Sequence, residues 1–162
     1  MTSTNATDAA GIIYRERLTP SLWAFVSAAV VAPMAAMVFV PFDTTIALAA
    51  GIVVAVLVVV LMIAAAPRVE VRGGELVAGR AHIPVGFLDD VEPFVGNEAR
   101  DLRGPGLQRD AWHLIRGGID GIVQARVTDP ADPTPVWVIS SRTPDRLTAA
   151  VRRAQRAGTT TA

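Results

Sequence analysis

The apolar positions of this chain are concentrated in its first third. No residue from 22 to 42 is charged, and none from 44 to 66 is charged. About 20 consecutive apolar residues allow a helix to cross the hydrocarbon core of a bilayer. Strands are excluded as spanning elements, because their open edges leave backbone groups unsatisfied in lipid. The pattern predicts an N-terminal transmembrane helical hairpin over residues 21–66, with spans at about 22–42 and 44–66.

The connection between the two spans is short. Pro41 is expected to end the first helix because it lacks a backbone donor. Asp43 or Thr44 is expected to cap the second helix by accepting its free N–H groups. A cleaved signal peptide is the weaker alternative for the first stretch, since its apolar run is too long and a second run follows closely.

Small residues recur at four-residue intervals in both stretches. This spacing lets two helices approach closely in lipid. In an antiparallel hairpin, we expect Ala36 to lie near Ala47, Ala32 near Gly51 and Ala28 near Ala55. The candidate helix-packing residues are therefore Ala28, Ala32, Ala36, Ala47, Gly51 and Ala55.

Polar sequence resumes at Pro67. Apolar and charged residues alternate around Gly73-Gly74, which predicts a β-hairpin with a two-glycine turn. Further strands are expected at 81–85, 87–95, 111–115, 122–127 and 135–141. The glycine-rich and charged residues 96–109 are expected to form a mobile loop.

A final helix is predicted from the residues that follow the last strand. Thr143 suits the N-cap, Pro144 the first turn and Asp145 the positive end of the helix dipole. Its buried stripe is predicted at helical spacing, and Gly158 is expected to end it. The residues of this stripe are Leu147, Ala150, Val151 and Ala154.

Together these elements predict an α+β membrane protein. A cytoplasmic segment (1–20) precedes the hairpin, and a cytoplasmic β-rich domain with a C-terminal helix (67–158) follows it, with a disordered tail at 159–162. A small antiparallel β domain closed by a terminal helix is the pleckstrin-homology-like arrangement. That likeness is an analogy of fold and carries no function.

Charge supports this organisation and sets its orientation. The 15 basic residues are all Arg and balance 15 acidic residues, so the positive excess typical of nucleic-acid-binding proteins is absent and no nucleic acid partner is expected. Arginines flank the hairpin at 15, 17, 68 and 72, and the turn has none. The positive-inside rule then predicts a multi-pass protein of the inner (plasma) membrane with both termini cytoplasmic. Tyr14 and Trp23 are expected at the first membrane interface.

Residues with catalytic potential are few. The chain has no Cys, which excludes disulfides and thiolate chemistry. His82 and His113 stand alone, without the paired spacing of a metal site. The acidic cluster Asp89, Asp90 and Glu92 suits a solvated strand end better than acid–base chemistry, which needs carboxyls of separated pKa. We therefore predict no catalytic, cofactor-binding or metal-binding residues, and we do not expect an enzyme.

The arginines near the C-terminus are the most suggestive feature. A basic helix face on a tethered domain can rest on anionic headgroups, although an ordinary solvated face has the same composition. Arg142 precedes a helix N-terminus beside hydroxyl side chains, a combination that can bind an anion or can simply cap the helix. The candidate lipid or anion contacts are Arg142, Arg146, Arg152, Arg153 and Arg156.

Three stretches carry a resemblance to a known family. They are residues 14–18 with Pro20, residues 129–135 with Trp137, and residues 140–144 with Arg146-Leu147. With the two-span layout they resemble an actinobacterial membrane family, the domain-of-unknown-function family numbered three-zero-nine-three, from about Tyr14 to Ala154. The family often has an aromatic pair before the final strand, where this chain has Val136. The resemblance implies the topology and implies no catalytic residue or ligand.

The leading hypothesis is a non-enzymatic, membrane-anchored binding module for a protein partner or an anionic lipid. The alternative is an accessory subunit of a larger transporter or cell-envelope complex, which the small residues of the hairpin motivate. A third hypothesis is an enzyme acting on a lipid-soluble substrate through Asp89, Asp90 or His113.

Overall fold

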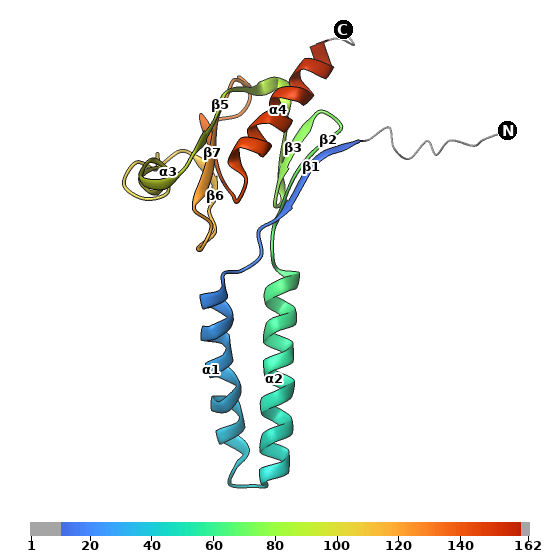
Figure 1. Cartoon of the computed structure of the whole chain (residues 1–162), viewed down its shortest axis with the longest axis vertical. Helices are drawn as coiled ribbons and strands as arrows, with labels where there is room; N and C mark the ends of the chain where they lie inside the picture. Colours follow the sequence, from blue (N-terminus) through green and yellow to red (C-terminus); the bar gives the residue numbers. More distant parts are fainter. Residues whose placement is uncertain (1–10, 160–162) are drawn as a thin grey trace, which may run out of the picture. The chain divides into compact units, whose positions relative to one another are not determined.

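The computed structural model describes residues 11–159, which form two compact units (Figure 1). Residues 19–66 make a helical hairpin, and residues 11–18 together with 67–159 make a β-rich domain. The hairpin is therefore inserted within the domain, and residues 11–18 of the predicted segment 1–20 are part of the domain. Residues 1–10, and 160–162 of the predicted tail, lie outside the described residues.

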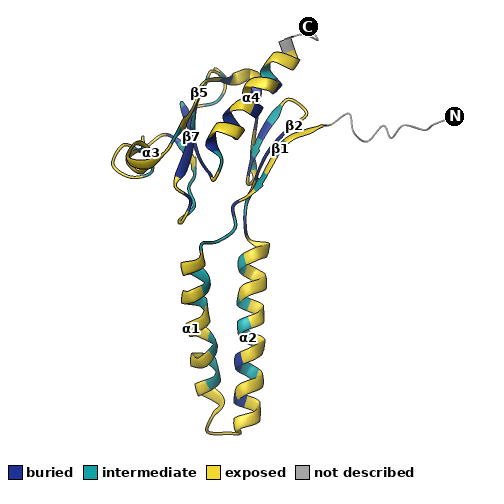
Figure 2. Ribbon diagram, viewed as in Figure 1, coloured by how far each residue is buried: buried dark blue, intermediate teal, exposed yellow. Residues whose placement is uncertain are grey.

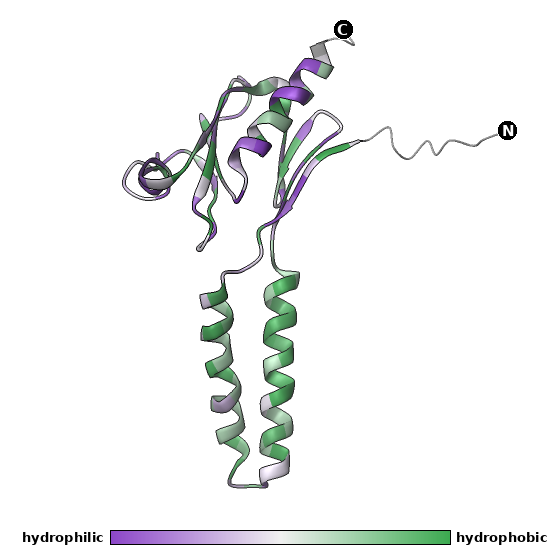
Figure 3. Cartoon of the chain, viewed as in Figure 1, coloured by the Kyte–Doolittle hydropathy of each residue, from purple (hydrophilic) through white to green (hydrophobic). Residues whose placement is uncertain are grey.

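The hairpin consists of α1 (Leu22–Phe39) and α2 (Thr44–Ala64), which are long and apolar enough to cross a membrane by length and composition. Figure 3 shows apolar residues along almost the whole of both helices. The first helix ends three residues before the predicted position, because the chain turns at Val40 and Pro41. The second ends at Ala64, two residues before the predicted position.

Asp43 is the N-cap of α2, as predicted for Asp43 or Thr44. Its Oδ1 accepts hydrogen bonds from the backbone N–H groups of Thr45 (2.7 Å) and Ile46 (3.1 Å). These two bonds, that of Ile46 first, favour the ionised carboxylate and hold the pKa of Asp43 below its usual value.

The two helices pack through their small residues. Gly51 is buried, and a Cβ placed on it would lie 3.1 Å from the Ala36 Cβ and 3.2 Å from the Ala32 carbonyl oxygen. The less exposed sides of α1 and α2 face one another (Figure 2). All six candidate packing residues are buried or half-buried: Ala28, Ala32, Ala36, Ala47, Gly51 and Ala55.

The first sheet of the domain is antiparallel throughout, in the order β1-β2-β3-β4. Its strands are β1 (Ile12–Arg17), β2 (Arg68–Arg72), β3 (Glu75–Ala78) and β4 (Ala81–Pro84). The predicted turn joins β2 to β3, with φ of +56° at Gly73 and +79° at Gly74. The edge strand β1 was not predicted; its partner β2 follows the hairpin, some fifty residues along the chain.

The second sheet has the order β5-β7-β8-β6. A short 3-10 helix, η1 (Val85–Phe87), precedes it, and its strands are β5 (Leu88–Phe94), β6 (Trp112–Leu114), β7 (Gly121–Val127) and β8 (Val136–Ser141). Strand β6 pairs with β8 in parallel, so the prediction of a wholly antiparallel domain is wrong. The register places Trp112 opposite Trp137, with ring centroids 4.2 Å apart.

Two helices complete the domain. The predicted loop at 96–109 is in part a helix, α3 (Gly96–Leu102), where Ala99 is buried in a small apolar cluster. The C-terminal helix α4 (Pro144–Thr159) begins as predicted and runs one residue past Gly158. Its predicted stripe enters the main core, which also draws residues from both sheets.

Helix α4 contacts both sheets, and Figure 1 shows it running between them. Its N-terminus is close to the start of β7, where a Cβ on Gly121 would collide with the Ser141 carbonyl and the ring of Pro144. The α+β class is confirmed: an apolar helical hairpin, β-sheets and a C-terminal helix. The domain contains two four-stranded sheets, and the predicted pleckstrin-homology-like arrangement is not confirmed.

Candidate functional site

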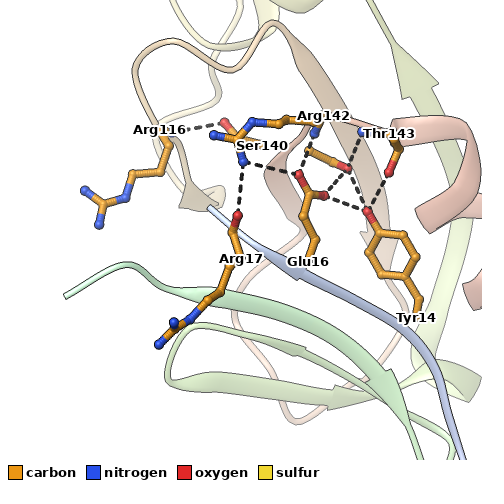
Figure 4. A network of polar contacts seen from close by, with 8 residues as sticks. Tyr14, Glu16, Arg17, Arg116, Ser140, Arg142 and Thr143 are labelled. Carbon is orange, nitrogen blue, oxygen red and sulfur yellow. Dashed lines mark hydrogen bonds and ion pairs between the residues drawn. The ribbon is translucent and has the colours of Figure 1, made fainter. Parts of the chain in front are cut away.

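A network of polar side chains joins β1 to the turn between β8 and α4 (Figure 4). The Tyr14 hydroxyl lies 2.6 Å from Glu16 Oε2, 3.2 Å from Ser141 Oγ and 2.9 Å from Thr143 Oγ1. Ser141 Oγ donates to Glu16 Oε2 (2.7 Å), and the Arg142 backbone N–H donates to Glu16 Oε1 (2.8 Å). Segments more than 120 residues apart therefore share one carboxylate.

The hydroxyl protons of this network have a consistent arrangement. Tyr14 and Ser141 both donate to Glu16, and Thr143 donates to the Tyr14 oxygen from its hydroxyl and to Ser141 Oγ from its backbone N–H (3.1 Å). The side chain of Glu16 is only 12% exposed. Burial, and secondly the bond to Glu16, raise the pKa of Tyr14 above its ordinary value.

Arg142 closes the same network from the other side. Its guanidinium donates to the Arg17 carbonyl (3.0 Å) and lies 3.9 Å from Glu16 Oε1. Arg142 was predicted as an anion contact. The structure places its guanidinium against β1, where part of its hydrogen-bonding capacity is already used.

A basic groove lies beside this network, between β1 and α4, and encloses about 620 Å³. Arginines line it from both elements, and Ala149 and Ala150 lie between the arginines of the helix. The lining residues are Ile13, Tyr14, Arg15, Glu16, Arg142, Thr143, Arg146, Ala149, Ala150 and Arg153. We call this cavity the β1–α4 groove.

Two of the groove arginines have free guanidinium groups. Arg146 and Arg153 are exposed, and neither guanidinium group makes a hydrogen bond or ion pair within the described part of the chain. They are seven residues apart on α4, which is two turns along one face of the helix, or roughly 10 Å. Arg15 instead pairs with the largely buried Glu70 (3.0 Å).

The remaining predicted arginines lie on the other side of α4. Arg152 donates to the Val91 carbonyl (2.8 Å), which ties the helix to β5. Together with Arg156 it lines a second hollow of about 670 Å³ that also contains Asp145. The five candidate arginines therefore do not form one basic face: Arg142, Arg146 and Arg153 line the β1–α4 groove, and Arg152 and Arg156 do not.

The acidic and histidine candidates are not brought together. Asp89 and Asp90 both pair with Arg126, at 2.7 and 2.8 Å, and Asp90 has a left-handed backbone with φ of +46°. His113 lies exposed on the edge strand β6, in the other sheet from His82. Among residues 11–159, no group of three or more His, Asp or Glu side chains is arranged to hold a metal ion.

Sequence reasoning missed the main members of the network and groove. Tyr14 was assigned to the membrane interface, and the structure places it within the β-rich domain instead. Glu16 and Arg15 were given no role as side chains in a site. A signal was present, since two of the stretches that carry the family resemblance, residues 14–18 and 140–144, meet in this network.

Comparison with known proteins supports one relationship. No curated protein and no solved structure matches this chain. A family model described as "Protein of unknown function (DUF3093)" matches residues 13–151, which include both helices of the hairpin, both sheets and the first half of α4. The chain therefore belongs to this family of proteins of unknown function.

Proposed function

We propose that this protein is a non-enzymatic binding module anchored in the plasma membrane by its helical hairpin, and that its β-rich domain binds an anionic lipid or a protein partner. The observation that carries the proposal is the pairing of β1 with β2 around an insertion of two helices of membrane-spanning length. At the base of the insertion, the Leu18 N–H donates to the Pro67 carbonyl (2.9 Å).

This pairing agrees with an even number of membrane spans. Strand β1 precedes the helices and β2 follows them, so a domain built from both must lie on one side of the membrane. Two spans return the chain to the side on which it began. The arginines at 15, 17, 68 and 72, with none in the turn, favour the cytoplasmic side for the domain and both termini.

The connections to the hairpin are short. Three residues, 19–21, separate Leu18 from α1, and two residues separate the end of α2 from Pro67. An extended chain spans at most about 3.5 Å per residue. Such short connections suit a module that acts at the membrane surface.

The residues gathered in the domain favour binding over catalysis. The carboxylate of the network, Glu16, already accepts three hydrogen bonds, and Asp89 and Asp90 pair with Arg126. The groups that remain available to a ligand in the β1–α4 groove are the guanidinium groups of Arg146 and Arg153. Guanidinium groups bind anions strongly and do not deprotonate.

The accessory-subunit alternative loses part of its motivation. The small residues that suggested a helix partner are used inside the hairpin, where Gly51 already lies against Ala32 and Ala36. An additional membrane partner would have to pack on the exposed outer faces of α1 and α2, which carry large apolar side chains.

Membrane extraction tests the anchor. The full chain, expressed with a tag, should stay in the membrane pellet through an alkaline carbonate wash and leave it in detergent. A matched chain in which Asn-Gly replaces residues 19–66 should appear in the soluble fraction. Release of the full chain by carbonate alone would contradict the proposed anchor.

The orientation and the binding role need a second measurement. Because the chain has no Cys, a single Cys placed at Ser3 or at Thr161 reports its own side of the membrane; both should be inaccessible to an impermeant maleimide in intact cells. Gentle detergent purification with cross-linking should then recover anionic lipid or one stoichiometric protein. Turnover of a lipid substrate by the purified protein would overturn the non-enzymatic role.

A further inference from the structure

We propose that the β1–α4 groove binds a phosphate-bearing ligand, held by Arg146 and Arg153 of α4. This inference rests on the proposed binding function and specifies its site and ligand class. The groove combines a cavity of about 620 Å³ with guanidinium groups on two of its walls.

The charge of the groove suits a phosphate. Four arginines line it, and two carboxylates lie against them: Glu16, at 3.9 Å from Arg142, and Glu70, at 3.0 Å from Arg15. These charges leave an excess of two positive charges, centred on Arg146 and Arg153. A phosphate monoester carries about −1.5 to −2 at neutral pH, which complements this excess better than a single carboxylate does.

The geometry of the two free arginines also suits a phosphate. They lie two helical turns apart on one face of α4, and the small side chains of Ala149 and Ala150 lie between them. These alanines leave space above the helix, and the long side chains of Arg146 and Arg153 can converge in that space from either side. Guanidinium forks match phosphate oxygens in a bidentate manner, and such charge-assisted bonds are about twice as strong as neutral ones.

The Glu16 network holds one wall of the groove in place. Tyr14 and Glu16 fasten β1 to the residues immediately before α4 through Ser141 and the Arg142 N–H. The distance between β1 and the first turn of α4 is thereby set before a ligand arrives. A preorganised site loses less conformational entropy on binding.

Binding assays on the full chain in detergent micelles test the proposal. Pyrophosphate, titrated by calorimetry, is the soluble probe, and phosphatidic acid, detected as retained adducts by native mass spectrometry, is the lipid probe. We expect at least one probe to bind, with affinity falling about tenfold in Arg146→Gln or Arg153→Gln and about a hundredfold in the double variant. Binding of pyrophosphate alone would identify a soluble phosphate ligand, and binding of phosphatidic acid alone a lipid headgroup.

Matched variants distinguish binding in the groove from general attraction to positive charge. Arg80→Gln/Arg109→Gln removes two exposed arginines elsewhere in the domain and should bind as the unchanged protein does. Arg146→Lys/Arg153→Lys keeps the charge, loses the forks and should bind with intermediate affinity. Circular dichroism should show the same thermal transition in all variants, because the substituted side chains are exposed and Gln is a good helix former.

Several results would overturn the proposal. Equal loss of binding in the groove pair and the control pair would show attraction to net charge, and binding of neither probe would exclude a phosphate ligand. Groove-dependent binding of a polyglutamate peptide without phosphate binding would point to an acidic protein segment. If the full chain still resists carbonate extraction and retains an anionic lipid or protein without the groove arginines, the proposed function stands and this inference alone fails.

Discussion

Glu16 joins two segments of the domain that are far apart in sequence. It lies on β1, yet its carboxylate accepts from Tyr14 on the same strand and from Ser141 and Arg142 at the end of β8. An amide in its place would offer one acceptor oxygen and an NH₂ group that faces other donors. Since buried donors left without an acceptor are costly, the contribution of Glu16 depends on its charge as well as its shape.

Replacing Glu16 by Gln should therefore destabilise the domain. We expect Glu16→Gln to lower the free energy of unfolding by about 1–3 kcal/mol, the usual range for a buried polar group that loses its partner. The matched control is Glu92→Gln, the same change at an exposed position of β5. Urea unfolding in detergent, followed by the near-ultraviolet signal of the Trp112–Trp137 pair, measures both variants. Equal midpoints for the two would show that the network contributes no stability.

The raised pKa of Tyr14 predicts that the stability of the folded protein falls at alkaline pH. Its pKa is raised in the folded protein, so the protonated phenol contributes stability that is fully present below the unfolded pKa of about 10. That stability is lost as the pH rises through the folded pKa, because the unfolded chain releases the proton first. Tyr14 is the single tyrosine of the chain, so an absorbance titration of phenolate reports it alone.

The same titration has an internal control. Glu16→Gln removes the neighbouring negative charge and the charged acceptor, so the Tyr14 titration should move toward its ordinary value without reaching it, because burial is the larger cause of the shift. A titration near pH 10 in the unchanged protein would contradict the buried, hydrogen-bonded geometry.

At the scale of elements, the packing inside the hairpin and the packing inside the domain depend on different forces. The helices α1 and α2 approach closely through small residues, which is the type of contact that membrane-spanning helices use. Helix α4 instead buries Leu147 and Val151 completely among residues of both sheets. Packing of α1 against α2 requires small side chains, whereas packing of α4 against the sheets requires large apolar side chains that fill the core.

A larger side chain at Gly51 should separate the two helices. In Gly51→Leu the new side chain meets the Ala36 Cβ and the Ala32 carbonyl, and rigid backbone cannot move aside without opening the interface. The matched control is Ala49→Leu, on the exposed side of the same helix. With Cys at Ala28 and Ala55, one turn from the contact on each helix, disulfide formation in membranes should slow about tenfold in Gly51→Leu only. Equal rates in both variants would mean that the close contact is absent.

At the scale of the whole molecule, the β-rich domain is discontinuous in sequence. Residues 11–18 supply an edge strand, the fully buried Leu18 and the Tyr14–Glu16 part of the network, and the rest begins at Pro67. The hairpin therefore occupies the position of a turn between two neighbouring antiparallel strands. Insertions are tolerated at such positions when the ends of the insertion are close together.

The hairpin should accordingly be replaceable by a turn. A chain in which Asn-Gly replaces residues 19–66 should fold as a soluble domain, because Leu18 and Pro67 are already hydrogen-bonded at 2.9 Å and Asn-Gly suits a tight connection. A chain beginning at Pro67 is the control and should fail to show a cooperative transition, since it lacks Leu18 and the network. Dispersed amide resonances from the control chain would show that β1 is dispensable.

Local composition determined the parts of this protein that depend on neighbours in sequence. The two apolar helices, the Asp43 cap, the Gly73-Gly74 turn and the start of α4 were all predicted, because each follows from residues within a few positions of one another. The small residues at the helix interface were also visible in the sequence, since an antiparallel hairpin has few ways to pair.

The tertiary structure decided everything that joins distant segments. Strand β1 forms because it pairs with β2, which lies some fifty residues later in the chain. Strand β6 pairs in parallel with β8 and does not pair with β7, the next strand in sequence. Residues 96–102 form a helix that buries Ala99. The candidate arginines were identified, but their division between the groove and the opposite side of α4 depends on which sheet each one meets. Pairing across long loops is set by the packing of the whole core, and no local pattern encodes it.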